Sequence, residues 1–221
     1  MNIFEGKTAL VTGGGSGLGE AISRDLASAG ANVVVVDINL DNADAVADEI
    51  RAGGSNAVAF AADVAVARDS QKAVEFAVET YGSLNYAVNN AGIGGGNTLV
   101  GEVDIEDWNR VIATNLSGVL YGMRYQIPAI LDAGAHIGSI VNIASIHGEV
   151  AAPGFPAYTA SKHGVVGLTR SAAVEYGPRG LRVNAIGPGY IDTPMVALAT
   201  AEMVADLKTK HPLGRLGRPE E

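Results

Sequence analysis

Tyr158 and Lys162 are the two residues whose types and spacing best suit chemistry. They lie four positions apart, and positions i and i+4 of a helix share one face. An ammonium beside a phenol favours the phenolate, whereas an unperturbed phenol has a pKa of about 10. Such a phenol can act as the base when an alcohol gives a hydride to a nicotinamide and a proton to the protein. The same pair is also common on ordinary helix surfaces, so the rest of the sequence has to decide between a catalytic pair and a surface pair.

Ser145 and Asn115 supply part of that context. Ser145 follows the apolar run 140–143, a predicted strand, and open α/β sheets bind ligands at the carboxyl ends of their strands. Its alternative role is a loop or helix-capping hydroxyl. Asn115 lies in a segment of helical pattern, where asparagine has low propensity. It either belongs to the site or hydrogen-bonds between packed helices.

A glycine-rich stretch, 12–19, follows the first predicted strand and opens the first predicted helix. Glycines permit a tight turn and close approach of a pyrophosphate, and amide groups at a helix start favour that anion. An ordinary strand-to-helix turn is the alternative. Asp37 ends the second predicted strand, eighteen residues after Gly19. Its carboxylate either accepts the ribose hydroxyls of an adenosine or caps a helix.

The carboxylate of Asp37 also bears on the choice between NAD and NADP. It would repel a 2′-phosphate, and Ser16, Ile38 and Asn39 supply no cation to hold one. The sequence therefore predicts NAD as the cofactor.

Short apolar runs alternate along the chain with Ala-rich stretches of helical pattern. The run 33–36 is apolar throughout, which suits a parallel sheet covered by helices on both faces. We expect an α/β fold with a doubly wound, Rossmann-type parallel sheet in one domain, residues 1–221. The strands are expected at 8–12, 33–36, 57–60, 84–88, 139–143 and 181–186, with helices ending at 29, spanning 41–51 and ending near 177.

Composition and charge exclude several classes of protein. A net charge of −9 argues against nucleic-acid or anionic-membrane partners, which need a basic surface. Residues 1–7 lack the layout of a signal peptide, and no apolar run reaches the length of a membrane span. Without cysteine, disulfides and thiolate sites are excluded, and four scattered histidines predict no metal site. We expect a soluble, cytoplasmic protein.

Together these features resemble the short-chain dehydrogenase/reductase family in its single-domain form. The chain carries the family's TGxxxGxG loop at 12–19, its NNAG element at 89–92 and its YxxxK pair at 158–162, in the family's order. The resemblance covers about residues 7–221. It implies an NAD-dependent oxidoreductase that interconverts a secondary alcohol and a ketone, assembled as a homotetramer.

The resemblance also implies roles for the matched residues. Ser145 would hydrogen-bond the substrate oxygen, Tyr158 with Lys162 would move the proton, and Asn115 would hold a water that links the lysine to solvent. Asp63 and Val64 would contact the adenine, 90–92 the adjacent ribose and 188–193 the nicotinamide. The expected cofactor contacts are Gly13, Ser16, Gly17, Leu18, Gly19, Asp37, Asp63, Val64, Asn90, Ala91, Gly92, Tyr158, Lys162, Pro188, Gly189, Ile191 and Thr193.

The last residues, 217–221, have the pattern of a helix start, with a proline followed by acids. Since family members end with one more helix and strand, we expect these to be missing after residue 221. The segment 190–210 is expected to be partly helical and to form either a substrate lid or plain surface packing.

Loops 94–97, 147–155 and 190–210 are expected to form the substrate pocket. His147 has either a loop role or a substrate contact, and no function is assigned to His163 or His211. Without a cationic clamp in these loops, a neutral secondary alcohol or ketone is preferred, but sugars, steroids, cyclic diols and 3-oxoacyl groups all stay open. The alternatives to an enzyme of this kind are an NAD-sensing protein of the same fold and a nucleotide- or methyl-donor-binding transferase.

Overall fold

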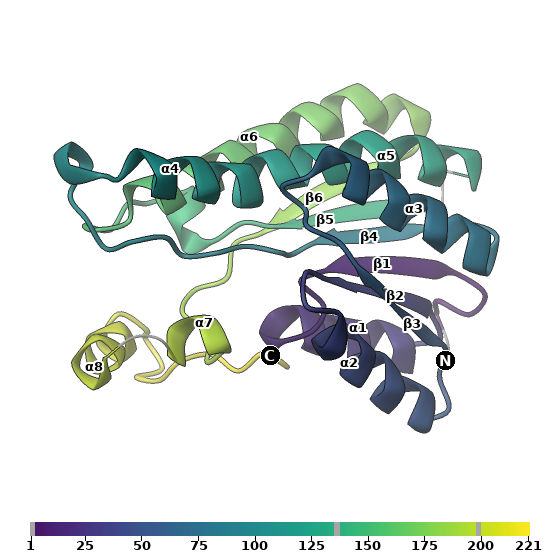
Figure 1. Ribbon diagram of the computed structural model, residues 1–221, viewed down its shortest axis with the longest axis horizontal. Helices are drawn as coiled ribbons and strands as arrows, with labels where there is room; N and C mark the ends of the chain where they lie inside the picture. The colour runs from purple at the N-terminus through teal and green to yellow at the C-terminus, as the bar shows by residue number, and fades with distance from the viewer. Residues whose placement is uncertain (1–2, 135–137, 198–199) are drawn as a thin grey trace.

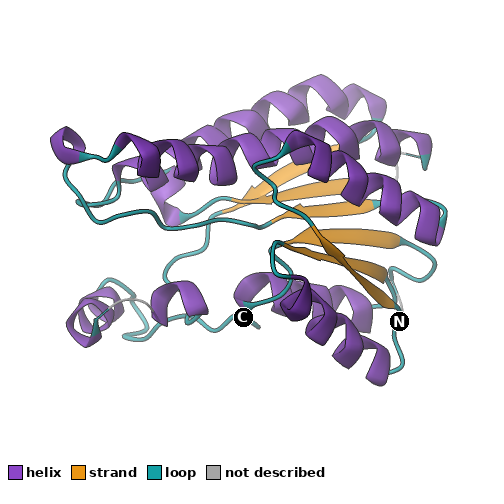
Figure 2. Ribbon diagram, viewed as in Figure 1, coloured by secondary structure: helices purple, strands orange, loops and turns teal. Residues whose placement is uncertain are grey.

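A six-stranded parallel sheet forms the centre of the protein (Figures 1 and 2). The computed structural model describes residues 3–134, 138–197 and 200–221. The strand order is β3-β2-β1-β4-β5-β6, the doubly wound arrangement expected from the sequence. The strands are β1 Thr8–Thr12, β2 Asn32–Asp37, β3 Ala57–Ala61, β4 Tyr86–Asn89, β5 Ser139–Ile143 and β6 Arg182–Ile186.

Helices cover both faces of this sheet, with α1 and α2 on one face and α3, α5 and α6 on the other (Figure 1). Short 3-10 turns are η1 Val100–Glu102, η4 Ile146–Gly148 and η5 Gly177–Arg179, and a π-helical turn, η2, spans Ala113–Ser117. The α-helices are α1 Gly17–Ser28, α2 Leu40–Ala52, α3 Ala67–Tyr81, α4 Ile105–Ile112, α5 Gly118–Asp132, α6 Pro156–Tyr176, α7 Pro194–Ala197 and α8 Ala201–Thr209.

The all-apolar strands supply two separate cores, because successive side chains of a strand point to opposite faces. Val33 and Val35 of β2 pack with α1 and α2, whereas Val34 and Val36 pack on the side of α3, α5 and α6. All four valines are buried. The burial of β2 on both faces confirms the inference drawn from its unbroken apolar run.

The carboxyl ends of β1 and β4 are adjacent although the two strands are far apart in sequence. Val11 of β1 is in register with Val88 of β4, and with Val35 of β2 on its other side. The chain leaves β1 towards one face and β4 towards the other, so a crevice opens between the loops that follow them. This topological switch point is where the glycine-rich stretch lies.

The element boundaries differ little from those expected. The fourth strand begins at Tyr86 rather than 84, because Asn85 uses its side chain to accept the Thr8 amide. Segment 195–210 is helical as expected but divided into α7 and α8, and residues 198–199 of the proposed lid lie outside the described residues. Among residues 3–134, 138–197 and 200–221, no helix has the length and apolar character needed to cross a membrane.

Candidate active site

Helix α6 places Tyr158 and Lys162 at the carboxyl end of β5. The helix starts at Pro156, whose ring fixes a helical φ and whose missing N–H costs nothing in a first turn. Lys162 is 3% exposed, and its Nζ donates to the Ile143 carbonyl at 2.7 Å. The same Nζ lies 5.6 Å from the centroid of the Tyr158 ring. The expected i, i+4 juxtaposition is therefore confirmed.

Burial controls the proton affinities of both side chains. Desolvation lowers the pKa of Lys162 to about 8. The pKa of Tyr158 is raised, mainly by burial, while a hydrogen bond with Ser145 acts in the opposite direction. The expectation that Lys162 lowers the pKa of Tyr158 is wrong for the described protein. The ammonium is directed at the Ile143 carbonyl, and Ser145 is the group that favours the phenolate.

Ser145 has the capping role that its sequence position left open, and it lies next to Tyr158. It precedes η4, and its Oγ accepts the amide of His147 at 3.2 Å. This bond occupies a lone pair of the oxygen, so the hydroxyl proton stays available to another acceptor. Ser145 is buried beside Tyr158. The capping contact thus orients the hydroxyl toward the phenol.

Asn115 lies in the π-helical turn η2 and is fully buried. It exchanges two 2.8 Å hydrogen bonds with Ile93, because Nδ2 donates to the Ile93 carbonyl and Oδ1 accepts the Ile93 amide. A Cβ added at Gly92 would lie 3.3 Å from Asn115 Oδ1 and 3.6 Å from Lys162 Nζ. Asn115 Nδ2 also donates to the hydroxyl of Ser161 in α6 at 3.2 Å. Asn115 therefore links the loop after β4 to the helix that carries Lys162.

The glycine-rich stretch leaves room only for backbone. Gly13 has φ of 62°, and a Cβ there would lie 2.9 Å from the Ala91 Cα. A Cβ on Gly19 would lie 2.0 Å from the Gly13 carbonyl oxygen. Gly17, at the start of α1, also has a positive φ, and a Cβ added there would lie 3.3 Å from the Thr193 side chain. The loop after β4 therefore packs against one side of the stretch, and the segment after β6 packs against the other, so side chains larger than glycine do not fit at these positions.

Several other residues that are expected to contact the cofactor lie around this glycine turn. Asp37 accepts the Gly15 amide at 3.0 Å through Oδ2, so its carboxylate already faces the glycines. Asn90 donates to the Thr12 and Gly13 carbonyls at 3.0 and 3.2 Å and joins β4 to the turn. Ser16 immediately precedes α1, where its side chain caps nothing and is exposed, and Leu18 lies half-buried in the first turn.

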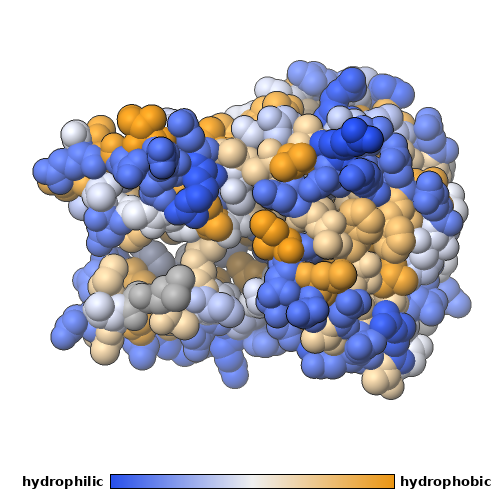
Figure 3. Space-filling view, in the orientation of Figure 1, coloured by the Kyte–Doolittle hydropathy of each residue, from blue (hydrophilic) through white to orange (hydrophobic). Residues whose placement is uncertain are grey.

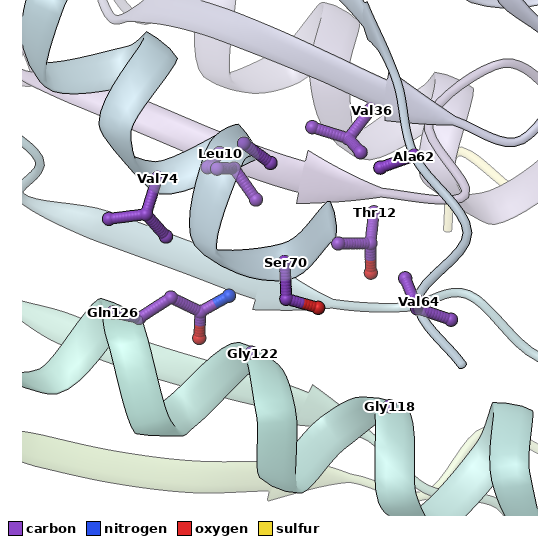
Figure 4. Close-up of a pocket in the computed structure, with 11 residues that line it drawn as sticks. Leu10, Thr12, Val36, Ala62, Val64, Ser70, Val74, Gly118, Gly122 and Gln126 are labelled. Carbon is purple, nitrogen blue, oxygen red and sulfur yellow. The ribbon is translucent and has the colours of Figure 1, made fainter. Parts of the chain in front are cut away.

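Asp63 and Val64 follow β3 at the same edge. The Asp63 carboxylate accepts the Ala65 amide at 2.9 Å. Val64 packs against Gly118 of α5, where an added Cβ would lie 3.0 Å from a Val64 methyl. Figure 4 shows Val64 at the mouth of a cavity between β1, α3 and α5 that also receives Thr12 and Gln126. At about 10 Å³ this cavity has room for about one water molecule, which is too little for a substrate.

The segment after β6 returns to the site and is held there by backbone contacts. Pro188 accepts the amide of Ile146 at 2.9 Å, next to Ser145. Ile191 forms a bridge with Gly217. In Figure 3 the surface is hollowed between α4 above and the α7–α8 segment below, at the carboxyl edge of the sheet seen in Figure 1. The α7–α8 segment, part of the expected substrate pocket, borders this hollow.

Three residues of this region were not recognised as a unit from the sequence. His147 is buried and its ring lies edge-on to those of Tyr158 and Tyr190, at centroid distances of 5.5 and 6.2 Å. Tyr190 donates its amide to Nε2 of His211 at 2.9 Å. A Cβ on Gly189 would lie 2.9 Å from the His211 ring. In the sequence, the one signal of this packing is that Gly189 directly precedes Tyr190.

Among the described residues, no three His, Asp or Glu side chains lie close enough together to hold a metal ion.

Comparison with known proteins agrees with this arrangement. The family model described as short chain dehydrogenase matches residues 7–203. Cyclohexanol dehydrogenase of Acinetobacter sp. (strain SE19) is 51% identical over all of this chain and 86% of its own length. A 2,5-dichloro-2,5-cyclohexadiene-1,4-diol dehydrogenase of Sphingobium indicum is 41% identical over all of this chain and 88% of its length.

A solved structure gives the same result for the fold. The 3-ketoacyl-(acyl-carrier-protein) reductase from Brucella melitensis, complexed with NADH, superposes with a TM-score of 0.91 at 36% identity, over 98% of this chain and 87% of that one. The chain therefore belongs to the short-chain dehydrogenase family and is an oxidoreductase acting on CH–OH groups.

Proposed function

We propose that the protein is an NAD-dependent dehydrogenase that interconverts a secondary alcohol on a six-membered carbon ring and the corresponding ketone. The observation that carries this proposal is the juxtaposition of the Tyr158 phenol and the Ser145 hydroxyl, next to the buried Lys162, at the carboxyl edge of the sheet. The ring substrate is inferred from the relatives, which are named for cyclohexanol and for a cyclohexadiene-1,4-diol.

A dinucleotide fits the crevice at the switch point. Gly13, Gly17 and Gly19 let the turn pack closely against the neighbouring segments, and the amide groups at the start of α1 would favour the pyrophosphate. Asp37 would accept ribose hydroxyls, and Asn90 to Gly92 would lie under the adjacent ribose. Bound there, the nicotinamide supplies the hydride acceptor.

Residues after β3 and β6 would contact the two ends of the dinucleotide. Asp63 and Val64 would flank the adenine at the end of β3. The nicotinamide end would be met by residues of the segment after β6, namely Pro188, Gly189, Ile191 and Thr193.

The protein's own residues would handle the proton. Ser145, whose Oγ accepts the His147 amide, would donate a hydrogen bond to the substrate oxygen and keep its proton. Tyr158 Oη takes the proton of the alcohol as the hydride leaves carbon. Lys162, whose ammonium donates to the Ile143 carbonyl, lies beside the ring with its Nζ 5.6 Å from the centroid. Asn115 holds the loop that shapes this side of the pocket. The segment 190–210 would close over the substrate as a lid.

The choice of NAD over NADP rests on Asp37. Its carboxylate lies at the end of β2 and faces the glycine turn through Gly15. A 2′-phosphate in the same place would meet a like charge. We expect kcat/KM to favour NAD over NADP, and Asp37→Ser to shift that ratio toward NADP by about tenfold or more. Equal use of the two cofactors by the unaltered protein would contradict this choice.

The main experiment measures NAD reduction with cyclohexanol and a panel of other secondary alcohols. Tyr158→Phe should keep the NAD affinity, measured calorimetrically, but lower kcat by about 100- to 10,000-fold. Tyr176→Phe, at the other end of the same helix, is the matched control and should leave kcat unchanged. Near-normal turnover by Tyr158→Phe would refute the proton-transfer role, and NAD binding without turnover of any alcohol would favour an NAD-sensing protein. The homotetramer and the cytoplasmic location stay predictions from the sequence.

A further inference from the structure

His147 and Tyr190 form a polar pair in the wall of the substrate pocket, beside the reacting groups but separate from them. His147 comes from η4 and Tyr190 from the segment after β6. Nε2 of the histidine lies 3.5 Å from the Tyr190 hydroxyl. The phenol of Tyr190 is also near enough to Tyr158 to raise its pKa. Two elements far apart in sequence thus bring a second hydroxyl to the site.

The hydrogen bonds around His147 give this hydroxyl a direction. The ring is 5% exposed, and burial is the main cause that lowers its pKa, so the neutral form is favoured. Nδ1 lies 3.4 Å from the Thr159 hydroxyl. When Thr159 donates to Nδ1, the remaining ring proton is on Nε2 and points to the Tyr190 oxygen. Tyr190 then accepts from His147 and keeps its own proton free to donate.

We propose that Tyr190, oriented by His147, binds a second, uncharged oxygen of a ring substrate, and so sets a preference for ring alcohols that carry two oxygens over those that carry one. This inference rests on the proposed function. Tyr190 is half-buried, with its backbone fixed by the bond to His211. Once substrate covers it, a donor of this kind discriminates strongly, because a substrate without the matching oxygen leaves it unpaired.

The charges around the pair favour an uncharged oxygen. The ammonium of Lys210 acts electrostatically on both His147 and Tyr190, and His163 also acts on His147. The Lys210 ammonium is already bonded to Asp206 at 2.6 Å, so the two charges largely cancel. A hydroxyl or carbonyl oxygen needs only the Tyr190 proton, whereas a carboxylate would have to compete with Asp206 for the lysine.

The test compares cyclohexane-1,4-diol with cyclohexanol as substrates. The unaltered protein should show the higher kcat/KM for the diol. Tyr190→Phe should lower kcat/KM for the diol about tenfold or more relative to that for cyclohexanol, mainly through KM, and so abolish the preference. His147→Phe should act like Tyr190→Phe, while His147→Gln, whose amide can replace the Nε2 donor, should retain the preference. Tyr176→Phe is the matched control.

The outcomes separate this inference from the proposed function. If the unaltered protein oxidises both alcohols without preference, or if Tyr190→Phe lowers both rates equally, Tyr190 has no role in specificity and the inference is overturned. If the unaltered protein binds NAD but oxidises neither alcohol, the proposed function fails and the inference fails with it.

Discussion

Replacement of Lys162 by methionine should separate stability from activity in this site. The pKa of the buried ammonium falls from 10.5 to about 8. Since one pKa unit corresponds to about 1.4 kcal/mol, burial of the charge costs about 3 kcal/mol of folding free energy. Methionine removes that cost, but it also leaves the Ile143 carbonyl without its 2.7 Å donor, a loss of about 1–2 kcal/mol. At about pH 7 we expect the variant to be more stable by about 1–2 kcal/mol, and to lose most activity.

The pH dependence is the sharper part of this prediction. Between pH 8 and 10.5, Lys162 binds fewer protons in the folded than in the unfolded protein, so the free energy of unfolding rises with pH. The penalty is complete below that interval and is relieved as pH increases through it. Relative to Lys162→Met, the unaltered protein should therefore gain about 2.5 kcal/mol between about pH 7 and about pH 10.

Urea unfolding followed by circular dichroism at several pH values measures this difference. Lys72→Met removes a charge from the exposed side of α3 and controls for the change in net charge. A stability difference between the protein and Lys162→Met that stays constant with pH would refute the reasoning, because it would mean that the ammonium is not desolvated in the folded state.

Three further substitutions test how the site is held. Gly19→Ala places a Cβ 2.0 Å from the Gly13 carbonyl oxygen, so the turn has to shift, and calorimetry should show NAD affinity reduced about tenfold or more; unchanged affinity would argue against this turn as the pyrophosphate site. Gly189→Ala puts a Cβ 2.9 Å from the His211 ring and should raise KM for the alcohol while NAD affinity is kept, as steady-state kinetics would show. Asn115→Ala removes both hydrogen bonds that hold the loop after β4 and should lower the free energy of unfolding by about 1–3 kcal/mol, measured in urea; a smaller kcat with unaltered stability would contradict this structural share of its role.

Much of the fold and part of the site follow from local patterns in the sequence. The run 33–36 predicts a strand buried on both faces, and the two cores that it feeds confirm this, because alternation along a strand is a local property. The four-residue spacing of Tyr158 and Lys162 predicts their juxtaposition for the same reason, since helix geometry decides it.

Other features depend on contacts between segments far apart in the chain, and only the tertiary structure decides them. The raised pKa of Tyr158 comes mainly from burial, and Ser145, not the lysine one turn away, is the group that opposes it. The pairing of His147 with Tyr190 joins residues 43 positions apart. Spacing along the chain determines which side chains share a helix face or a strand end, but desolvation and long-range hydrogen bonds arise only when separate elements pack together.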